Sequence, residues 1–363
     1  MDYTQPLQYH YKPAKGWMND PNGLVYFKGY YHAFYQHAPH HPVPWQEPMH
    51  WGHARTKDFL HWEELPVALT PGDPYDGGGC WSGTAIVKGD KLYLFYAAIT
   101  AVSTIAVAVS EDGIHFEKYG GNPVIATFPP EGGPDFRDPA VCCMNGVYYC
   151  VVASGHPATQ TARLMLYRSE DLLTWEFLSV MGEWPHAKYA ECPSIVPLGG
   201  NKCMLATSVC NLDETHFFQI MTGTLEDGTF HCELSDRFDK GPDQYAGQMF
   251  ASADGTPLLM TWIPGWKFAR FAEGVDVGCL SIPRQIVLQN GHLCGRPAEE
   301  VAHLLKPSDP AVKLTEEGFV VERTARPPLI HTGEVRDLQI LRDEYIMEIF
   351  VNGGETVYSL LLC

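Results

Sequence analysis

Positive charge is scarce in this sequence of 363 residues: 25 lysines and arginines stand against 43 aspartates and glutamates, for a formal net charge of −18. So acidic a chain is repelled by nucleic-acid phosphates and by anionic membrane surfaces, and we expect neither as a partner. A neutral sugar is unaffected by this field, whereas a phosphorylated one would need a local basic pocket.

Paired cysteines are also lacking. None of the eleven cysteines has the CxxC spacing typical of a zinc site; Cys142 and Cys143 are adjacent and the others are scattered. We therefore expect reduced, mostly buried thiols. Residues 1–6 show neither the charged start nor the apolar run of a secretory signal. Together these features predict a cytoplasmic protein.

Long helical patterns are few. The 34 glycines and 28 prolines favour turns and short strands. One uncharged stretch, residues 92–109, is about long enough for a membrane span. It is rich in tyrosine, threonine, serine and β-branched residues, which favour a sheet, so we expect two strands there and no span.

A repeat of about 55 residues runs through the chain. Residues 56–63, 110–117 and 169–176 each read Ser/Thr-x-Asp-x-x-x-aromatic-Glu, and residues 226–230 form a weaker copy. Asp58, Asp112 and Asp171 are 54 and 59 residues apart. Self-similarity at this period indicates a radial array of small sheets.

Each repeat unit also contains a predicted hairpin. The paired strands are 24–27 with 30–36, 84–87 with 92–96, 140–143 with 147–152, 194–197 with 203–208, and 248–251 with 257–262. The Asn145-Gly146 turn is a strong hairpin signal. Five units of about four strands predict an all-β fold, a five-bladed β-propeller. A long β-sandwich is the alternative, but it would not explain the period.

The pattern changes after Leu293. Residues 296–305 read as a short helical or extended linker, and strands are predicted near 319–322 and 345–351. We predict a catalytic propeller over 1–296, a linker over 297–306 and a small, truncated β-sandwich-like domain over 307–363. Such a short domain is marginal alone, so it should pack on the propeller.

Three acids fall at equivalent places in the repeat. Asp20, Asp138 and Glu191 each lie where the first strand of a unit is predicted to begin, at spacings of 118 and 53 residues. Residues 81–83 and 245–248 occupy the matching places in units two and five. First strands line the channel of a propeller, so these acids should meet at one mouth.

Clustered carboxylates repel one another, which raises at least one pKa and provides an acid and a base in one site. Glycoside cleavage needs that arrangement. The plain alternatives are that Asp20 caps the tight turn expected at Pro21-Asn22-Gly23, that Asp138 pairs with Arg137, and that Glu191 is a solvated loop residue.

A group of histidines invites a metal-site interpretation: His37, His40, His41, His50 and His53. Their spacing matches no common zinc motif, so we expect no metal and no cofactor. Trp45, Trp51 and Trp62 are expected in the core or at its rim, where one could line a sugar site.

At these residues the chain resembles glycoside hydrolase family 32, the invertase, fructanase and sucrose-6-phosphate hydrolase family. The matching segments are residues 17–23, 34–36, 50–54, 61–62, 81–83, 136–139, 191–193 and 283–284. The resemblance runs from about residue 8 to residue 300 and resumes over 346–353. Three catalytic segments in the family's order make it specific.

The resemblance implies a five-bladed propeller joined to a β-sandwich, and hydrolysis of terminal β-fructofuranosides with retention. It implies that Asp20 is the nucleophile, Glu191 the general acid/base, and Asp138 the transition-state stabiliser. The fructose-binding residues it implies are Asn19, Gln36, Ser82 and Arg137, with help from Trp45 and Trp81. The C-terminal part is less than half as long as the family's usual sandwich.

We therefore expect a retaining β-fructofuranosidase acting on sucrose, sucrose-6-phosphate or short fructo-oligosaccharides. A fructosyltransferase on the same site and a non-catalytic sugar-binding propeller are the alternatives. The short C-terminal part further predicts either a homo-oligomer or a domain lying flat against the first blades, with Ile346, Ile349 and Phe350 buried.

Overall fold

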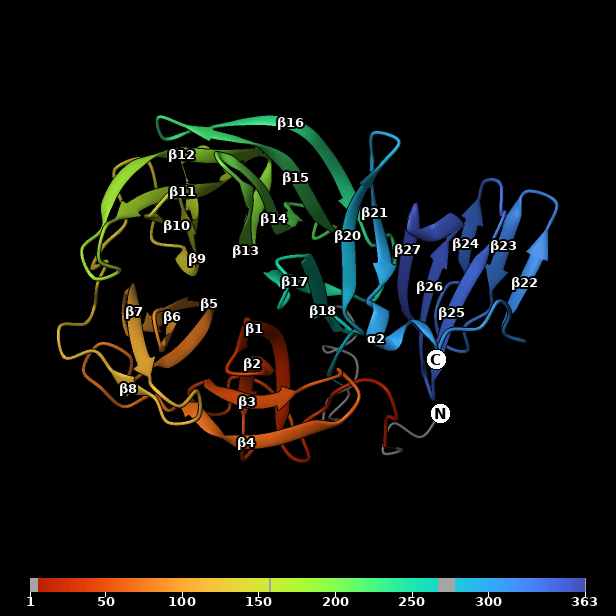
Figure 1. Ribbon diagram of the computed structural model, residues 1–363, viewed down its shortest axis with the longest axis horizontal. Helices are drawn as coiled ribbons and strands as arrows, with labels where there is room; N and C mark the ends of the chain where they lie inside the picture. The colour runs from red at the N-terminus through yellow and green to blue at the C-terminus, as the bar shows by residue number, and fades with distance from the viewer. Residues whose placement is uncertain (1–5, 157, 267–277, 363) are drawn as a thin grey trace.

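The computed structural model describes residues 6–156, 158–266 and 278–362. In this described part, nearly all regular structure is antiparallel β-sheet, and the first 297 residues build five sheets with four-stranded paths. Figure 1 shows these sheets arranged around a common centre. The all-β prediction is confirmed.

The strands of the five sheets follow one another along the chain. The first sheet contains β1 (Trp17–Phe27), β2 (Tyr30–Ala38), β3 (His50–Thr56) and β4 (Trp62–Leu69). The second contains β5 (Gly79–Lys88), β6 (Lys91–Ile99), β7 (Ser103–Ser110) and β8 (Glu117–Lys118). The third contains β9 (Phe136–Met144), β10 (Val147–His156), β11 (Thr161–Ser169) and β12 (Glu176–Pro185).

The fourth sheet contains β13 (Ala187–Gly199), β14 (Lys202–Asn211), β15 (His216–Glu226) and β16 (Thr229–Phe238). The fifth contains β17 (Tyr245–Ala251), β18 (Pro257–Ile263), β20 (Arg284–Gln289) and β21 (His292–Pro297), and β19 (Cys279–Leu280) also pairs with β18. All five predicted hairpins are confirmed.

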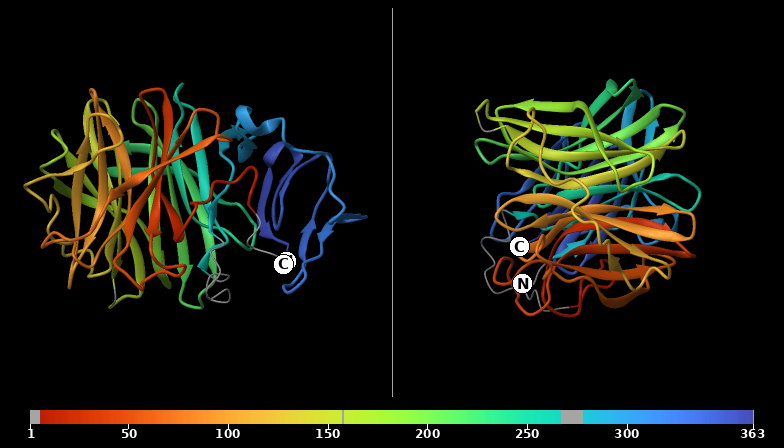
Figure 2. Two further views of the ribbon diagram at one scale, coloured as in Figure 1. Left: turned by 90° about the horizontal axis from the view of Figure 1, so that it is seen from below. Right: turned by 90° about the vertical axis from the view of Figure 1, so that its left-hand side faces the viewer.

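The first strands of the five sheets contact one another in a ring: β1 with β5, β5 with β9, β9 with β13, β13 with β17, and β17 with β1. Residues that start these strands are thus brought to one central region, although up to 228 residues of sequence separate β1 from β17. Figure 2 shows the same sheets from two further directions.

The repeated Ser/Thr-x-Asp motif forms the turn between the third and fourth strands of a sheet. Asp58 Oδ1 accepts hydrogen bonds of 2.9 and 2.8 Å from the two following N–H groups of Leu60 and His61. Asp112 and Asp171 accept the equivalent pairs at 2.8 Å. The repeat therefore has a local structural cause: each of the three full copies closes the same kind of turn.

Residues 92–109 fall in β6 and β7, as predicted. In the described ranges, no helix is long and apolar enough to cross a membrane. The ten cysteines of the described chain are unpaired, and all but Cys143 and Cys232 are buried, which confirms the expectation of mostly buried thiols for these ten.

The C-terminal part follows a four-residue helix, α2 (Glu299–Ala302), and consists of two three-stranded sheets within the described chain. One contains β22 (Val312–Thr315), β23 (Gly318–Val321) and β24 (Leu329–Thr332). The other contains β25 (Leu338–Asp343), β26 (Ile346–Val351) and β27 (Thr356–Leu361), with the 3₁₀ turn η1 (Asn352–Gly354) between β26 and β27.

This C-terminal part packs against the fifth sheet, as Figures 1 and 2 show, and not against the first sheets. Arg284 of β20 donates to Glu348 of β26 at 2.6 Å, and both side chains are fully buried. Ile346, Ile349 and Phe350 are fully buried as predicted. The expected position was wrong because the partner for the apolar face of β26 is its neighbour in sequence, β20–β21, together with residues 10–11.

Candidate active site

A bulge interrupts the first strand of every one of the five sheets at the same level. The register shifts lie between Met18 and Pro21 in β1, Trp81 and Gly83 in β5, Arg137 and Ala140 in β9, Glu191 and Ser194 in β13, and Tyr245 and Gln248 in β17. A bulge adds a residue on one strand and re-aims its side chains. The five bulges thus direct side chains from all five sheets into one site.

The bulges correct one local prediction. Asp20 does not precede a strand at a tight turn; β1 begins at Trp17 and runs through Asp20, Pro21 and Gly23. A strand can continue past a proline at a bulge because the ladder there needs no N–H donor. The backbone is also strained at three of the bulges. Asp138, Cys192 and Ala246 have φ values of 58°, 49° and 54°, in the left-handed region that residues other than glycine rarely adopt.

Asp20 is held at one of its two carboxylate oxygens. Ser82 Oγ donates to Asp20 Oδ2 at 2.7 Å, and the Cys192 thiol lies 3.5 Å from the same oxygen. Oδ1 has no hydrogen-bond partner within the described chain. Burial raises the pKa of Asp20, the hydrogen bond from Ser82 partly offsets that rise, and the charge of Glu191 adds to it.

Asp138 is 3% exposed and accepts a 2.9 Å hydrogen bond from the backbone N–H of Cys192. The Cys192 thiol lies 3.6 Å from its Oδ2. The pKa of Asp138 is raised to about 7: burial is the largest cause, Arg137 opposes it, and the charges of Glu191 and Asp20 add to the rise. The thiol touches the carboxylates of both aspartates, so these two acids converge on one point.

Glu191 precedes that thiol in the chain, and its carboxylate is held from both sides. Arg137 donates to Oε1 from Nη2 at 2.7 Å and from Nε at 3.2 Å, and Tyr245 donates its hydroxyl to Oε2. Arg137 also forms an ion pair with Asp135. Glu191 is therefore not a free loop residue, and the Arg137 guanidinium bonds Asp135 and Glu191.

Tyr245 was not among the predicted site residues. It is 4% exposed, and its ring centre lies 5.1 Å from that of His216. The sequence held one signal for it: residues 245–248 occupy the place in the fifth repeat that the acids occupy in other repeats.

The remaining predicted residues surround the carboxylates. Asn19, 1% exposed, accepts a 2.7 Å hydrogen bond from Trp17 Nε1. Gln36, 2% exposed, donates from Nε2 to the carbonyl of Cys80 at 3.0 Å, next to Trp81 in β5. These buried amides have few protein partners, which leaves bonding capacity for a polar ligand.

Tryptophan rings form one continuous cluster beside the acids. Trp45, which is half exposed, has its ring centre 5.1 Å from that of Trp81 and 6.1 Å from that of Trp266. Trp266 in turn lies 6.3 Å from Trp17 and 4.9 Å from Trp262. Trp262 and Trp266 were not predicted as site residues, because nothing in their local sequence separates them from ordinary core aromatics.

The other residues with predicted packing roles are structural. Trp51 is fully buried and donates to the carbonyl of Trp81, and the Trp62 ring centre lies 5.0 Å from that of Tyr11. His32 and His53 bond each other, and His37 bonds the carbonyl of Trp17. Among the described residues, no group of three or more histidine, cysteine, aspartate or glutamate side chains could hold a metal ion.

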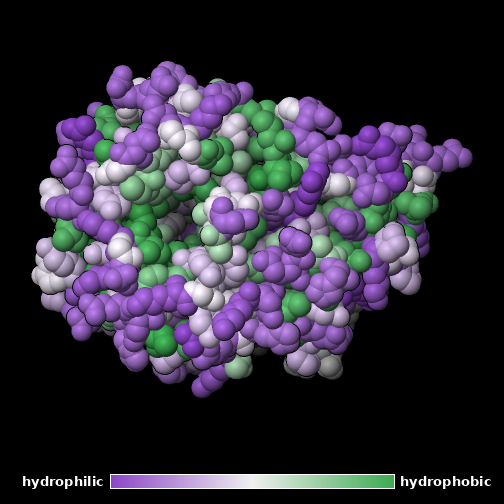
Figure 3. Space-filling view, viewed as in Figure 1, coloured by the Kyte–Doolittle hydropathy of each residue, from purple (hydrophilic) through white to green (hydrophobic). Residues whose placement is uncertain are grey.

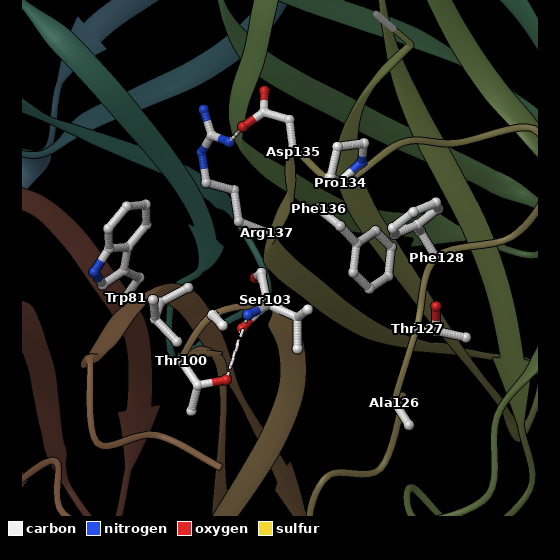
Figure 4. Close-up of a pocket in the computed structure, with 13 residues that line it drawn as sticks. Trp81, Thr100, Ser103, Ala126, Thr127, Phe128, Pro134, Asp135, Phe136 and Arg137 are labelled. Atoms are coloured by element: carbon white, nitrogen blue, oxygen red, sulfur yellow. Dashed lines mark hydrogen bonds and ion pairs between the residues drawn. The ribbon is translucent and has the colours of Figure 1, made fainter.

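A pocket of about 320 Å³ lies beside Arg137, and Figure 4 shows its walls. Trp81 and Arg137 belong both to this pocket and to the site just described. The space-filling view shows a hollow at the centre of the five sheets with apolar surface along its wall (Figure 3).

Comparisons with known proteins agree with this geometry. The model of the "Glycosyl hydrolases family 32 N-terminal domain" matches residues 10–297. The chain is 35% identical over 323 residues to a raffinose invertase of Escherichia coli, covering 83% of this chain and 66% of that protein. It is 34% identical over 363 residues to a sucrose-6-phosphate hydrolase of Zymomonas mobilis, covering 92% and 69%.

Solved structures give the same result. The Bombyx mori β-fructofuranosidase BmSUC1 is 28% identical, with a TM-score of 0.83 over 98% of this chain and 89% of that one. A sucrose-6-phosphate hydrolase from Lactobacillus gasseri, 22% identical, shares the fold with a TM-score of 0.82 over 98% and 88%. The chain spans about two thirds of the length of the curated relatives it matches. On the family model and these relatives, the chain belongs to glycosyl hydrolases family 32.

Proposed function

We propose that this protein is a retaining β-fructofuranosidase that hydrolyses terminal non-reducing β-D-fructofuranosides. One observation carries the proposal: Asp20, Asp138 and Glu191 come from three different sheets and meet around Cys192. Burial and the neighbouring acids raise the pKa of Cys192, so its thiol stays neutral between them. A site of this kind provides separate carboxyl groups for attack, protonation and substrate binding.

In the first step Asp20 attacks the anomeric carbon of the fructosyl unit, and Glu191 protonates the departing oxygen. Oδ1 of Asp20 is the attacking oxygen, because Ser82 holds Oδ2. In the second step Glu191 removes a proton from water, which attacks the fructosyl-enzyme and releases fructose. Its bonds from Arg137 and Tyr245 fix the direction of its carboxylate.

Asp138 binds fructose hydroxyls and stabilises the positive charge that develops in the transition state. Asn19, Gln36, Ser82 and Arg137 form the fructose pocket around it. Trp45 and Trp81 cover the sugar's apolar side, with Trp266 beside them. Aromatic rings suit this role because they contact C–H groups without competing for the hydroxyls.

The proposal includes the architecture that carries the site. The five sheets are the blades of a five-bladed propeller over residues 1–296, residues 297–306 link it to the C-terminal part, and residues 307–363 form a shortened β-sandwich. Two observations support this division into domains. The first strands of the five sheets contact one another in a ring, and β22–β24 and β25–β27 form two separate three-stranded sheets. We also propose a cytoplasmic enzyme, for which the unpaired thiols are the support.

The deciding experiment is a product analysis on sucrose, sucrose-6-phosphate, kestose, inulin and levan. Hydrolysis releases fructose and the remaining sugar in equal amounts, whereas fructosyl transfer releases an excess of glucose from concentrated sucrose. Proton NMR during the first turnovers should show the β-anomer of fructose, because a retaining site performs two inversions. If no substrate yields free or transferred fructose, the enzymatic proposal is wrong and the protein is a non-catalytic sugar-binding protein.

Retention also requires a particular spacing. The carboxyl groups of Asp20 and Glu191 should lie roughly 5–5.5 Å apart in the substrate complex, against roughly 6.5–9.5 Å for inversion. A structure with a bound fructoside would measure it, and the longer separation would remove the covalent intermediate from the mechanism.

A further inference from the structure

The pocket beside Arg137 meets the candidate active site at two residues, Trp81 and Arg137. Its walls come from Trp81 in β5, the turn 99–103 between β6 and β7, the loop 126–128, and residues 134–137 at the start of β9. Trp81 precedes Ser82, which bonds Asp20, and Arg137 bonds Glu191. The acid that protonates the departing oxygen must reach that oxygen directly. A pocket joined to Glu191 through Arg137 is therefore positioned to receive the leaving group.

The walls have the composition of a sugar subsite. In Figure 4, the ring of Trp81 lies across the space from those of Phe128 and Phe136, with Thr100 and Ser103 along the lower side. The Ser103 hydroxyl has no hydrogen-bond partner among the described residues. Opposed apolar faces and a free hydroxyl match a pyranose, which offers C–H faces and a ring of hydroxyls.

The charge of the pocket separates two classes of leaving group. All thirteen lining residues belong to the described chain, and among them the ionisable ones are Asp135 and Arg137. The guanidinium of Arg137 is already engaged by Asp135 and by Glu191, and its carbon lies 4.8 Å from the centre of the Tyr189 ring. Asp135 is about one-third exposed and lines the pocket, so the negative charge of its carboxylate lies at the pocket wall.

We propose that this pocket binds an uncharged pyranose as the leaving group, and that it selects sucrose over sucrose-6-phosphate. The inference rests on the proposed function and narrows its substrate class. A phosphate on the departing glucose would meet the Asp135 carboxylate and find no lining cation free to neutralise it. A neutral glucose instead donates hydroxyls to Asp135 and Ser103.

The test measures binding, so that it does not depend on turnover. Titration calorimetry on an Asp20→Asn protein, with sucrose and with sucrose-6-phosphate, gives the preference directly. We expect sucrose to bind at least about tenfold more tightly, the scale of an unscreened like-charge contact in a partly closed site. Equal or tighter binding of sucrose-6-phosphate, or no binding of sucrose, would overturn the proposal.

A second variant introduces a cation into the wall. Thr127 lines the pocket and is exposed, so Thr127→Lys in the Asp20→Asn background should not disturb the core. We expect it to lower the preference for sucrose by roughly five- to tenfold. Asp135 is left intact in this test because its pairing with Arg137 would mix two effects.

The matched control is Thr229→Lys, which makes the same change at an exposed position on β16, the outermost strand of the fourth sheet. It should leave the preference unchanged. An unmoved preference in Thr127→Lys, or an equal change in both variants, would contradict the pocket assignment. Should Thr127→Lys fail to fold, the two titrations on Asp20→Asn still decide the question. A wild-type protein that prefers sucrose but releases no fructose would refute the proposed hydrolysis and the leaving-group role, while the selection of a neutral pyranose by this pocket would still be supported.

Discussion

Ser82 Oγ donates a 2.7 Å hydrogen bond to Oδ2 of Asp20, while Oδ1 of the same carboxylate has no partner in the described chain. The two residues lie in the bulges of neighbouring first strands, β1 and β5. One oxygen is therefore used for orientation and the other is left for chemistry. Because Ser82 orients the carboxylate and Asp20 performs the attack, mutations of the two residues should have effects of different size.

The first prediction concerns this pair. Asp20→Asn should remove turnover while keeping the fold, because the amide is isosteric but a poor nucleophile. Ser82→Ala should lower kcat by roughly 10–100-fold, the value of one hydrogen bond to a charged group. Steady-state kinetics on sucrose measure both.

Ser235→Ala, at an exposed position of β16, is the control for loss of a serine hydroxyl and should behave like the wild type. An Asp20→Asn protein with near-normal activity on fructosides would mean that another residue is the nucleophile.

The second prediction separates the role of Glu191. Glu191→Ala should reduce kcat on sucrose by roughly 10²–10⁴-fold, because the departing oxygen needs a proton. An aryl β-fructofuranoside with an acidic leaving group needs little protonation, so formation of the fructosyl-enzyme should be much less impaired. Burst kinetics would detect the accumulated intermediate, and an equal loss on both substrates would argue against the acid role.

The sequence predicted the strands and the acids for a physical reason. Alternating apolar residues and Gly-containing turns are local features, so the hairpins from 24–36 to 248–262 could be located without long-range information. The position of Asp20, Asp138 and Glu191 in the repeat then placed them together. Bulges interrupt the alternation of apolar residues and have no local sequence signal of their own. The predicted first strands therefore began after the bulges, although the real strands begin before them.

Contacts between remote segments were beyond local patterns. The bond from Tyr245 to Glu191 joins the fifth sheet to the fourth, and no spacing rule identifies a phenol as the partner of a carboxylate 54 residues away. The C-terminal part was likewise assigned to the wrong neighbour. The buried ion pair of Arg284 with Glu348 fixes its place, and a sequence shows the two charges but not their burial.

The third prediction links Asp138 to stability. Its folded pKa of about 7 lies above the usual value of 3.8, chiefly because of burial. A raised carboxyl pKa contributes stability that is present below pH 4 and lost as pH rises through 7, so ionised Asp138 is costly in the folded state. Asp138→Asn should therefore be inactive yet more stable than the wild type at pH 8, by up to about 4 kcal/mol.

Thermal midpoints at pH 5 and pH 8 measure this effect. The stabilising effect of Asp138→Asn should be smaller at pH 5, where the wild-type carboxyl is already protonated. Asp90→Asn, in the exposed turn between β5 and β6, is the matched control. A stabilising effect that does not grow with pH would show that the charge of Asp138 is not its source.

The fourth prediction concerns His10, which bonds Asp343 at 2.8 Å and Glu348 at 2.9 Å. Burial would lower its pKa, but these two carboxylates raise it to about 9. A raised histidine pKa contributes stability that is present below pH 6.5 and lost as pH rises through 9. Urea midpoints should therefore fall over this window, by up to about 3 kcal/mol in unfolding free energy.

In His10→Gln the free energy of unfolding should fall much less between pH 6.5 and pH 9, because glutamine has no proton to lose in this range. His231→Gln, at an exposed site on β16, should keep the wild-type slope. Identical slopes in all three proteins would show that His10 is not charged in the folded state.

The last prediction concerns the attachment of the C-terminal part. Glu348 is fully buried and bonds Arg284, His10 and the backbone N–H of Ile282, so it joins β26 to the fifth sheet and to the N-terminal segment. Glu348→Ala leaves two buried cations short of a partner and should cost about 3 kcal/mol or more. The exposed Glu316→Ala should cost nothing measurable.

Deleting residues 307–363 should be more severe. It removes Glu348, Asp343 and Ser359 together and leaves Arg284 with Asp239 as its remaining bonded partner in the described network. It also uncovers the apolar side of the fifth sheet, where Ile286 and Leu293 pack against Phe350 and Val357 in one core. His10 loses both of its carboxylate partners, Asp343 and Glu348. A buried cationic group without partners beside exposed apolar surface favours aggregation, so we expect an insoluble product. A truncated protein that stays soluble and keeps the activity and thermal midpoint of the full chain would show that this interface does not stabilise the active site.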